Sequence, residues 1–338
     1  MKRKLSILVY AAAFAAAALY AQQPTAPPAT RQAGPSAPAP AAQPPAAQPA
    51  GQQGDTNAYT LRLPVNEVSL IFTVTDRHGH YIPNLQQSDF ALLDDRKAPA
   101  KVNSFHQQIN LPLRVGILID SSTSIRSRFQ FEQQSAIEFL LEIIKARSDR
   151  AFVMDFDETP RIDQDWTNNL DGLETGVNRV HPGGGTALYD AVYTACRDKL
   201  LTERGPEPVR KAMVLISDGN DNQSRAYQDE AIKMCQRAET IIYAISTNWT
   251  PSRGKGDQAL TQMAKETGGQ AFFPPSVEEM SNSFHGIEEE LRSQYALNYI
   301  PADFKEDGAF RPIYLYCYNR SYIVRTRTGY FAHQPQKK

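Results

Sequence analysis

The sequence predicts an α/β fold with a doubly wound, mainly parallel sheet, joined to a smaller domain of β segments. The run from Leu113 to Asp120 is almost entirely apolar, which is typical of a strand buried on both faces. Across residues 111–292 such strands alternate with helical patterns, and this alternation predicts right-handed crossovers and a parallel sheet. The stretches on either side, residues 57–108 and 293–332, instead contain short alternating segments bounded by turn residues.

Residues 1–21 are predicted to be a secretory signal peptide. Three basic residues at positions 2–4 precede an apolar, alanine-rich run from Leu5 to Ala21. This run is a little shorter than the ~20 residues that span a bilayer. We therefore expect cleavage after Ala21, with an uncleaved N-terminal membrane anchor as the alternative, and a mature protein that is secreted or periplasmic.

Residues 22–56 consist mainly of Pro, Ala and Gln and contain almost no large apolar side chain. Such a composition cannot bury a core, so we expect a disordered, partly polyproline II linker. The linker would hold the folded part away from a membrane or wall, or it would serve solubility alone.

The two flanking β segments are expected to fold together. In the first, Val68, Leu70, Phe72 and Val74 form one apolar face, and further strands are expected at 90–93 and 101–105. In the second, strands are expected at 294–300, 313–318 and 322–328. Neither segment is long enough to bury a core comfortably alone. We predict one discontinuous β domain, with two independent β appendages as the alternative.

The central region is predicted to hold six strands and six helices. The strands are expected at 113–120, 150–156, 162–166, 211–217, 240–246 and 270–273. The helices are expected at 129–146, 170–180, 187–201, 227–238, 257–267 and 277–292. The two longest apolar strands are each followed or ended by an aspartate, Asp120 and Asp218, at the edge where parallel sheets place their sites.

Charge and cysteine content exclude some classes of protein. The formal charge of −1 is too balanced to suggest nucleic acid as a partner. The three cysteines are too few, and odd in number, for a disulfide framework. Cys196 and Cys235 lie in apolar helical patterns, so we interpret them as buried small hydrophobes, with a bridge between them as the alternative.

Five oxygen-bearing side chains are predicted to form a metal site. Asp120, Ser122 and Ser124 alternate directly after the first long strand, Thr186 follows three glycines, and Asp218 follows the second long strand. Carboxylate and hydroxyl oxygens are the ligands that Mg²⁺ prefers, with Mn²⁺ as the alternative occupant. Without a metal, Asp120, Ser122 or Thr186 would cap helices, and the residues after Ser217 would form an ordinary turn. Asp221 is interpreted as a solvated turn carboxylate, with a hydrogen-bond acceptor that supports the site as the alternative.

These motifs resemble the metal-ion-dependent adhesion site of the von Willebrand factor A (VWA) domain. The resemblance rests on DSSTS at 120–124, GGGT ending at Thr186 and SDG containing Asp218, and it covers residues 111–292. It implies a Rossmann-like sheet, with Ser122, Ser124 and Thr186 binding Mg²⁺ directly and the two aspartates acting mainly through water. The whole mature chain also resembles bacterial secreted VWA-related proteins, through residues 73–95 and the final TRTGYFA segment.

The resulting hypothesis is an exported, metal-dependent protein-binding module of adhesion type. It would share a Mg²⁺ ion with an acidic residue of a partner protein, and it would touch a membrane only through an uncleaved N-terminal segment. The alternative is a structural scaffold of the cell envelope in which the metal only stiffens the loops. We expect no enzyme, because the chain lacks a GxSxG elbow and GGGT lacks the lysine of a P-loop.

Overall fold

The computed structural model describes residues 67–109, 111–123, 129–145, 147–203, 209–248, 250 and 252–332, without the side chains of 108, 109, 277 and 278. The predicted signal peptide, the predicted linker, residues 57–66 and Ser124 lie outside the described residues. Within the described ranges, no helix has the length and apolar character needed to cross a membrane.

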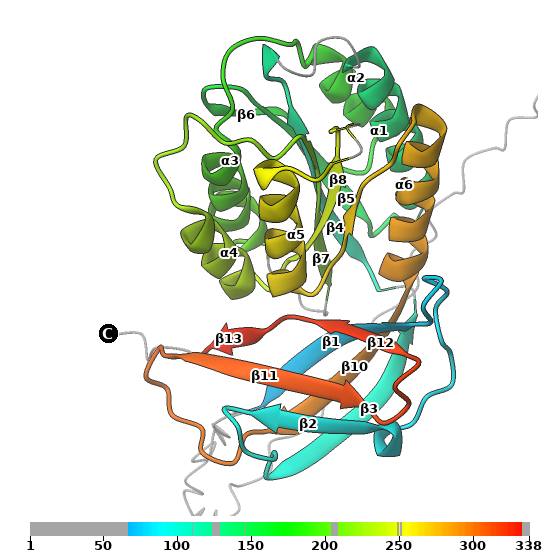
Figure 1. Cartoon of the computed structure of the whole chain (residues 1–338), viewed down its shortest axis with the longest axis vertical. Coiled ribbons are helices and arrows are strands. Elements are labelled where there is room, and N and C mark those ends of the chain that lie inside the picture. The colour runs from blue at the N-terminus through cyan, green and yellow to red at the C-terminus, as the bar shows by residue number, and fades with distance from the viewer. Residues whose placement is uncertain are drawn as a thin grey trace, which may run out of the picture. The chain divides into compact units, whose positions relative to one another are not determined.

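A six-stranded sheet forms the centre of the α/β domain, with the strand order β6-β5-β4-β7-β8-β9 (Figure 1). Neighbouring strands are parallel except for β6, which runs antiparallel to β5 at one edge. The strands are β4 (Leu113–Asp120), β5 (Arg150–Phe156), β6 (Pro160–Thr167), β7 (Arg210–Ser217), β8 (Ile241–Ser246) and β9 (Ala271–Phe272). This arrangement confirms the predicted doubly wound, mainly parallel fold class.

Helices cover both faces of this sheet (Figure 1). Helices α1, α2 and α6 contribute apolar side chains to the core on one face, and α3, α4 and α5 contribute them on the other. The helices are α1 (Phe129–Ile143), α2 (Leu170–Arg179), α3 (Leu188–Thr194), α4 (Gln228–Arg237), α5 (Lys255–Thr267) and α6 (Val277–Arg292). The single helix predicted at 187–201 is in fact α3 followed by a π-helical segment, Ala195–Leu200.

Strand β4 is apolar throughout because both of its faces are buried. Ile117 and Ile119 pack into the core under α1, α2 and α6, whereas Leu118 packs into the core under α3, α4 and α5. Gly116, just before these residues, leaves room for the ring of Phe152, which a side chain at this position would overlap. This buried strand places Asp120 at its carboxyl end.

The segments that flank the α/β domain make up two antiparallel sheets, ordered β12-β1-β10-β3 and β13-β11-β2. Their strands are β1 (Val68–Thr75), β2 (Phe90–Asp94), β3 (Lys101–Ile109), β10 (Ser293–Ile300), β11 (Phe310–Cys317), β12 (Ile323–Thr326) and β13 (Gly329–Phe331). A short 3₁₀ turn, Gln87–Asp89, precedes β2. Each sheet contains strands from both segments, and one apolar cluster with Leu70, Phe72 and Tyr295 lies between them. The two segments therefore share one β-sandwich.

The strand predicted at 322–328 is present but shorter: β12 covers Ile323–Thr326, and a separate strand, β13, follows at Gly329–Phe331 in the other sheet. Strand β12 pairs with β1, and β13 pairs with β11. The chain crosses between the sheets at Arg327 and Thr328, where Thr328 N donates to Glu266 O (3.2 Å). Gly329 permits the crossing, since a side chain there would overlap the ring of Phe310. A period-two pattern does not show where one strand ends and the next strand, in another sheet, begins.

The structure joins Cys196 and Cys235 in a disulfide, with 5.0 Å between their Cα atoms. Both residues are fully buried, Cys196 in the π-helical segment after α3 and Cys235 on α4, as their apolar surroundings predicted. The interpretation of them as unpaired small hydrophobes is corrected by this bond. Cys317 is free and only partly buried.

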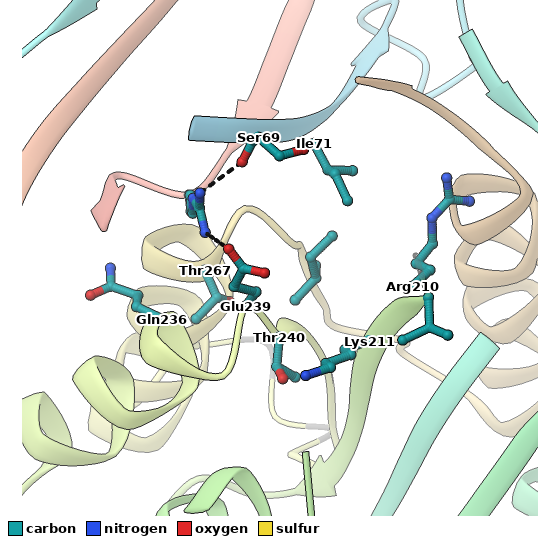
Figure 2. A pocket seen from close by; sticks show the side chains of 11 residues that line it. Ser69, Ile71, Arg210, Lys211, Gln236, Glu239, Thr240 and Thr267 are labelled. Atoms are coloured by element: carbon teal, nitrogen blue, oxygen red, sulfur yellow. Dashed lines mark hydrogen bonds and ion pairs between the residues drawn. The ribbon is translucent and has the colours of Figure 1, made fainter. Parts of the chain in front are cut away.

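A small pocket of about 70 Å³ is lined by residues of both the sandwich and the α/β domain. Figure 2 shows Ser69 and Ile71 on the side of β1, facing Lys211 and Thr240 across the pocket. Arg327 closes one side, because it donates to Ser69 O (2.8 Å) and also to Glu239 Oε1 (3.2 Å).

Candidate metal site

Asp120 is the most deeply buried member of the predicted site. It ends β4 with no exposed surface. Its Oδ1 accepts from Ser122 N (2.9 Å) and its Oδ2 accepts from Ser217 Oγ (2.6 Å). Burial raises the pKa of Asp120 to about 6; hydrogen bonds from Ser217 and Ser122 oppose this rise, and the negative charge of Asp218 adds to it. A buried carboxylate beside a second acid is a group that a nearby cation would stabilise.

The loop after β4 is held to strand β5. Ser121 N donates to Phe156 O (2.9 Å), and Ser121 Oγ donates to the buried Asp155 at Oδ2 (2.8 Å). Ser122 is 2% exposed and lies directly beside Asp120. Ser122 is therefore buried at the carboxyl edge of the sheet, in a loop that Ser121 ties to β5.

The glycine-rich loop lies directly against this first loop. Gly183 N donates to Ser121 O (2.6 Å), while Thr123 donates to Gly184 O from both N (3.3 Å) and Oγ1 (3.0 Å). Gly184 has φ +69°, a conformation that favours glycine. These contacts bring the chain just before Thr186 against the Asp120 loop.

Thr186 itself is 3% exposed and is held by hydrogen bonds from the loop after β7. Its N–H donates to Asn222 Oδ1 (2.9 Å), and its carbonyl accepts from the backbone of Asn222 (3.0 Å) and Gln223 (3.1 Å). The N-cap residue of α3 is Ala187, so the alternative that Thr186 serves as the N-cap is wrong.

Asp218 follows β7 on the third loop and is partly exposed. Its Oδ1 accepts from Asn220 N (2.9 Å), as in an ordinary turn of this sequence. Gly219 has φ +79° and packs so closely on the backbone of Gly256 that a side chain would overlap it. The close packing at Gly219 fixes the direction in which the chain leaves Asp218.

Hydrogen bonds thus tie the three loops to one another in a ring. The first loop contacts the second through Ser121 and Thr123, the second contacts the third through Thr186, and the third returns to Asp120 through Ser217. The structure places Asp120, Ser122, Thr186 and Asp218 on these loops; Ser124 lies outside the described residues. The donor set, two carboxylates and buried hydroxyls, fits a hard divalent cation such as Mg²⁺.

Sequence reasoning missed several residues that support the site. Ser217 donates to Asp120, and Asp155 holds Ser121 while also pairing with Arg161. Asp221 is partly exposed and accepts from Tyr189 N (3.2 Å) at the start of α3 and from Ser224, which favours the alternative of a supporting acceptor over a solvated turn carboxylate. One available signal was position: Asp155 lies near the carboxyl end of β5, as Asp120 does on β4.

These features define an α/β domain with carboxylate and hydroxyl side chains at the carboxyl edge of its sheet. The family model of the von Willebrand factor type A domain matches residues 115–286, just over half of the chain. The chain therefore belongs to this family, whose domains typically mediate protein–protein interaction.

Comparison with known proteins extends only over part of each chain. The human von Willebrand factor A domain-containing protein 3B is 27% identical over 165 residues, which are 46% of this chain and 11% of that protein. This chain thus spans about a tenth of the length of that curated relative.

Solved structures that are similar to part of this chain come from diverse sources. The vWF domain of the type V pili tip protein Mfa5 from Porphyromonas gingivalis is 14% identical, covers 54% of this chain and 95% of that one, and has a TM-score of 0.44. Proximal thread matrix protein 1 from the mussel byssus, described with a zinc-occupied MIDAS motif, is 18% identical, covers 55% of this chain and 49% of that one, and also has a TM-score of 0.44.

Proposed function

We propose that this protein is an exported, non-catalytic binding module whose carboxyl-edge loops hold a divalent cation and bind an acidic residue of a partner protein. The observation that carries this proposal is the ring of three hydrogen-bonded loops around the buried Asp120. When bound, the cation supplies a positive charge with an open ligand position for a carboxylate.

The five residues divide into two roles. Ser122, Ser124 and Thr186 would bind Mg²⁺, or alternatively Mn²⁺, through their hydroxyl oxygens. Asp120 and Asp218 would act mainly through water. The hydrogen bonds in the structure support this division for Asp120, because each of its oxygens already accepts one bond from within the protein. With few negative charges in direct contact, the site keeps its attraction for an incoming carboxylate.

Export is supported by two independent features. The first 21 residues have the pattern of a signal peptide. The Cys196–Cys235 disulfide suits an oxidising compartment, since disulfides are rare in the cytosol. We therefore propose a secreted or periplasmic protein that contacts a membrane only if its N-terminal segment is retained. The balanced charge argues against nucleic acid as a partner.

A structural scaffold of the cell envelope is the second candidate function. The direct hydrogen bonds among the three loops favour it, because they already hold the loops together by protein atoms alone. In this case the cation would only add stiffness, and the partner would bind elsewhere on the surface.

One experiment separates the two candidates. The chain from residue 22 is immobilised, and proteins retained from its native cell envelope are compared in Mg²⁺, in EDTA, and after Mg²⁺ is restored. We expect retention of a partner that EDTA removes and Mg²⁺ recovers, and that Thr186→Ala abolishes. Thr175→Ala, an exposed threonine on α2, is the matched control. If the partner is retained equally with and without EDTA, and EDTA lowers the melting temperature of the protein, the result would instead support the scaffold.

A further inference from the structure

A groove of about 470 Å³ lies where α5 and β9 of the α/β domain approach strands β11 and β12 of the sandwich. Its volume falls within the ~300–1,000 Å³ typical of binding sites for ligands. It is lined by Arg253, Thr261, Lys265, Gly269, Gln270, Ala271, Phe273, Ile313–Tyr316 and Val324–Thr328. None of these residues belongs to the three metal-site loops.

The charge of the groove is one-sided. Among the described residues that line it, four are Arg or Lys and none is Asp or Glu. Arg325 and Arg327 are paired with Glu290 and Glu239. Lys265 and Arg253 are exposed and form no ion pair with any described residue; Arg253 instead lies over the ring of Phe273, 4.1 Å from its centroid. The groove therefore presents two uncompensated positive charges to solvent.

One wall of the groove is an unpaired strand edge. Pro312 O accepts from Asp95 N on the side of β2, whereas Ile313 N donates to Thr328 O on the opposite side (2.8 Å). Backbone groups alternate between the two sides of an antiparallel strand, so Leu315 directs its N–H and C=O groups to the same side as Ile313. Strand β13 pairs only with Phe310–Pro312, and no described strand pairs with Leu315 on this side.

Two exposed tyrosines stand along the same stretch of β11. Tyr314 and Tyr316 are 43% and 55% exposed, and their rings stack at 6.5 Å with an interplanar angle of 6°. They alternate with the buried Ile313 and Leu315, so they project from the outer face of the sheet. Exposed aromatic rings beside cations and a free strand edge are typical of a surface that binds another chain.

We propose that this groove binds an extended acidic peptide segment of a partner protein, which pairs as an added strand with β11 at Leu315. Its carboxylates would contact Lys265 and Arg253, and its alternate side chains would pack on Tyr314 and Tyr316. Charge complementarity selects the acidic partner, and the unpaired edge selects a peptide over other polyanions. This site is separate from the metal site and works without a cation.

The test uses the chain from residue 22 and a fluorescein-labelled peptide of alternating glutamate and valine, with binding followed by fluorescence anisotropy. We expect saturable binding that weakens with ionic strength and is unchanged by EDTA. The double variant Arg253→Glu/Lys265→Glu should weaken binding at least about tenfold, because it replaces attraction by repulsion. The matched control Arg197→Glu/Lys233→Glu makes the same change in charge away from the groove and should bind normally.

Further experiments test whether the groove binds an extended peptide strand. Two versions of the peptide, with the backbone nitrogens of either all glutamates or all valines methylated, remove the donors of one register each. The version whose methylated residues face β11 should lose most of its affinity, and equal binding by both versions would overturn strand addition. Lys265→Gln, a milder change, should weaken binding about threefold if the double variant folds poorly. Three outcomes would assign the groove to another occupant. The first is tighter binding of polygalacturonate than of the peptide. The others are a dimer that the charge reversal dissociates, and peptide binding that appears only after residues 22–56 are deleted.

Discussion

The three loops of the candidate metal site and the β-sandwich are held together by different interactions. The loops use small residues, glycines with positive φ and backbone hydrogen bonds, as between Gly183 N and Ser121 O (2.6 Å). The sandwich uses aromatic packing, in which Phe72 lies 5.5 Å from the ring of Tyr295 and 5.2 Å from that of Phe90. Burial of aromatic rings contributes strongly to the free energy of unfolding, whereas hydrogen bonds among polar loops mainly hold particular side chains in place.

This difference predicts that the two regions can be altered separately. Changes in the loops should affect cation and partner binding with little change in the free energy of unfolding. Changes in the sandwich should do the reverse, because its core contains none of the predicted ligands. The disulfide, in the core of the α/β domain, provides a third case.

The largest effect is expected from the disulfide. Cys196→Ser/Cys235→Ser should lower the free energy of unfolding by about 2–4 kcal/mol, because the bond closes a loop in the unfolded chain between residues 39 apart. Urea denaturation measures this change, with Cys317→Ser as the control for loss of a free thiol. Affinity for Mg²⁺ at temperatures where the variant is folded should be unchanged; a large loss would mean that α3 and α4 position the loops.

Asp120→Ala should weaken Mg²⁺ affinity by about 100-fold, the upper range for loss of a residue that supports metal ligands. The buried carboxylate would no longer orient Ser122 or offset the charge of the cation. Isothermal titration with MgCl₂ measures the affinity, and Asp229→Ala, an exposed aspartate on α4, is the control. The free energy of unfolding should change little, and unaltered Mg²⁺ affinity would contradict the proposed site.

The smallest effect is expected in the sandwich core. Tyr299 Oη and Tyr330 Oη donate to the buried Asp94 at Oδ2, at 2.7 and 3.0 Å. Tyr299→Phe should lower the free energy of unfolding by about 1–2 kcal/mol, since it removes one hydrogen bond to a charged group. Tyr322→Phe, at a partly buried tyrosine near β12, is the control. A loss of Mg²⁺ affinity in Tyr299→Phe would show that the two regions are coupled.

Much of the α/β domain could be predicted from local patterns. The bounds of β4, β5 and α6 agree with the expected ranges to within a few residues, because each has a clear apolar period and clear end signals. The β tail was harder, because the pattern at 322–328 does not show that β12 ends at Thr326 or that the following strand, β13, joins the other sheet.

The sequence by itself determined the order of strands and helices and the positions of Asp120, Thr186 and Asp218 relative to the strands, because these depend on periodicity within a few residues. Only the tertiary structure decided that Cys196 bonds to Cys235, that Ser217 and Asp155 support the metal-site loops, and that β11 keeps an open edge beside Lys265. Those features depend on how segments far apart in the chain pack together, as when Phe72 on β1 pairs with Tyr295 on β10, and no local pattern encodes that packing.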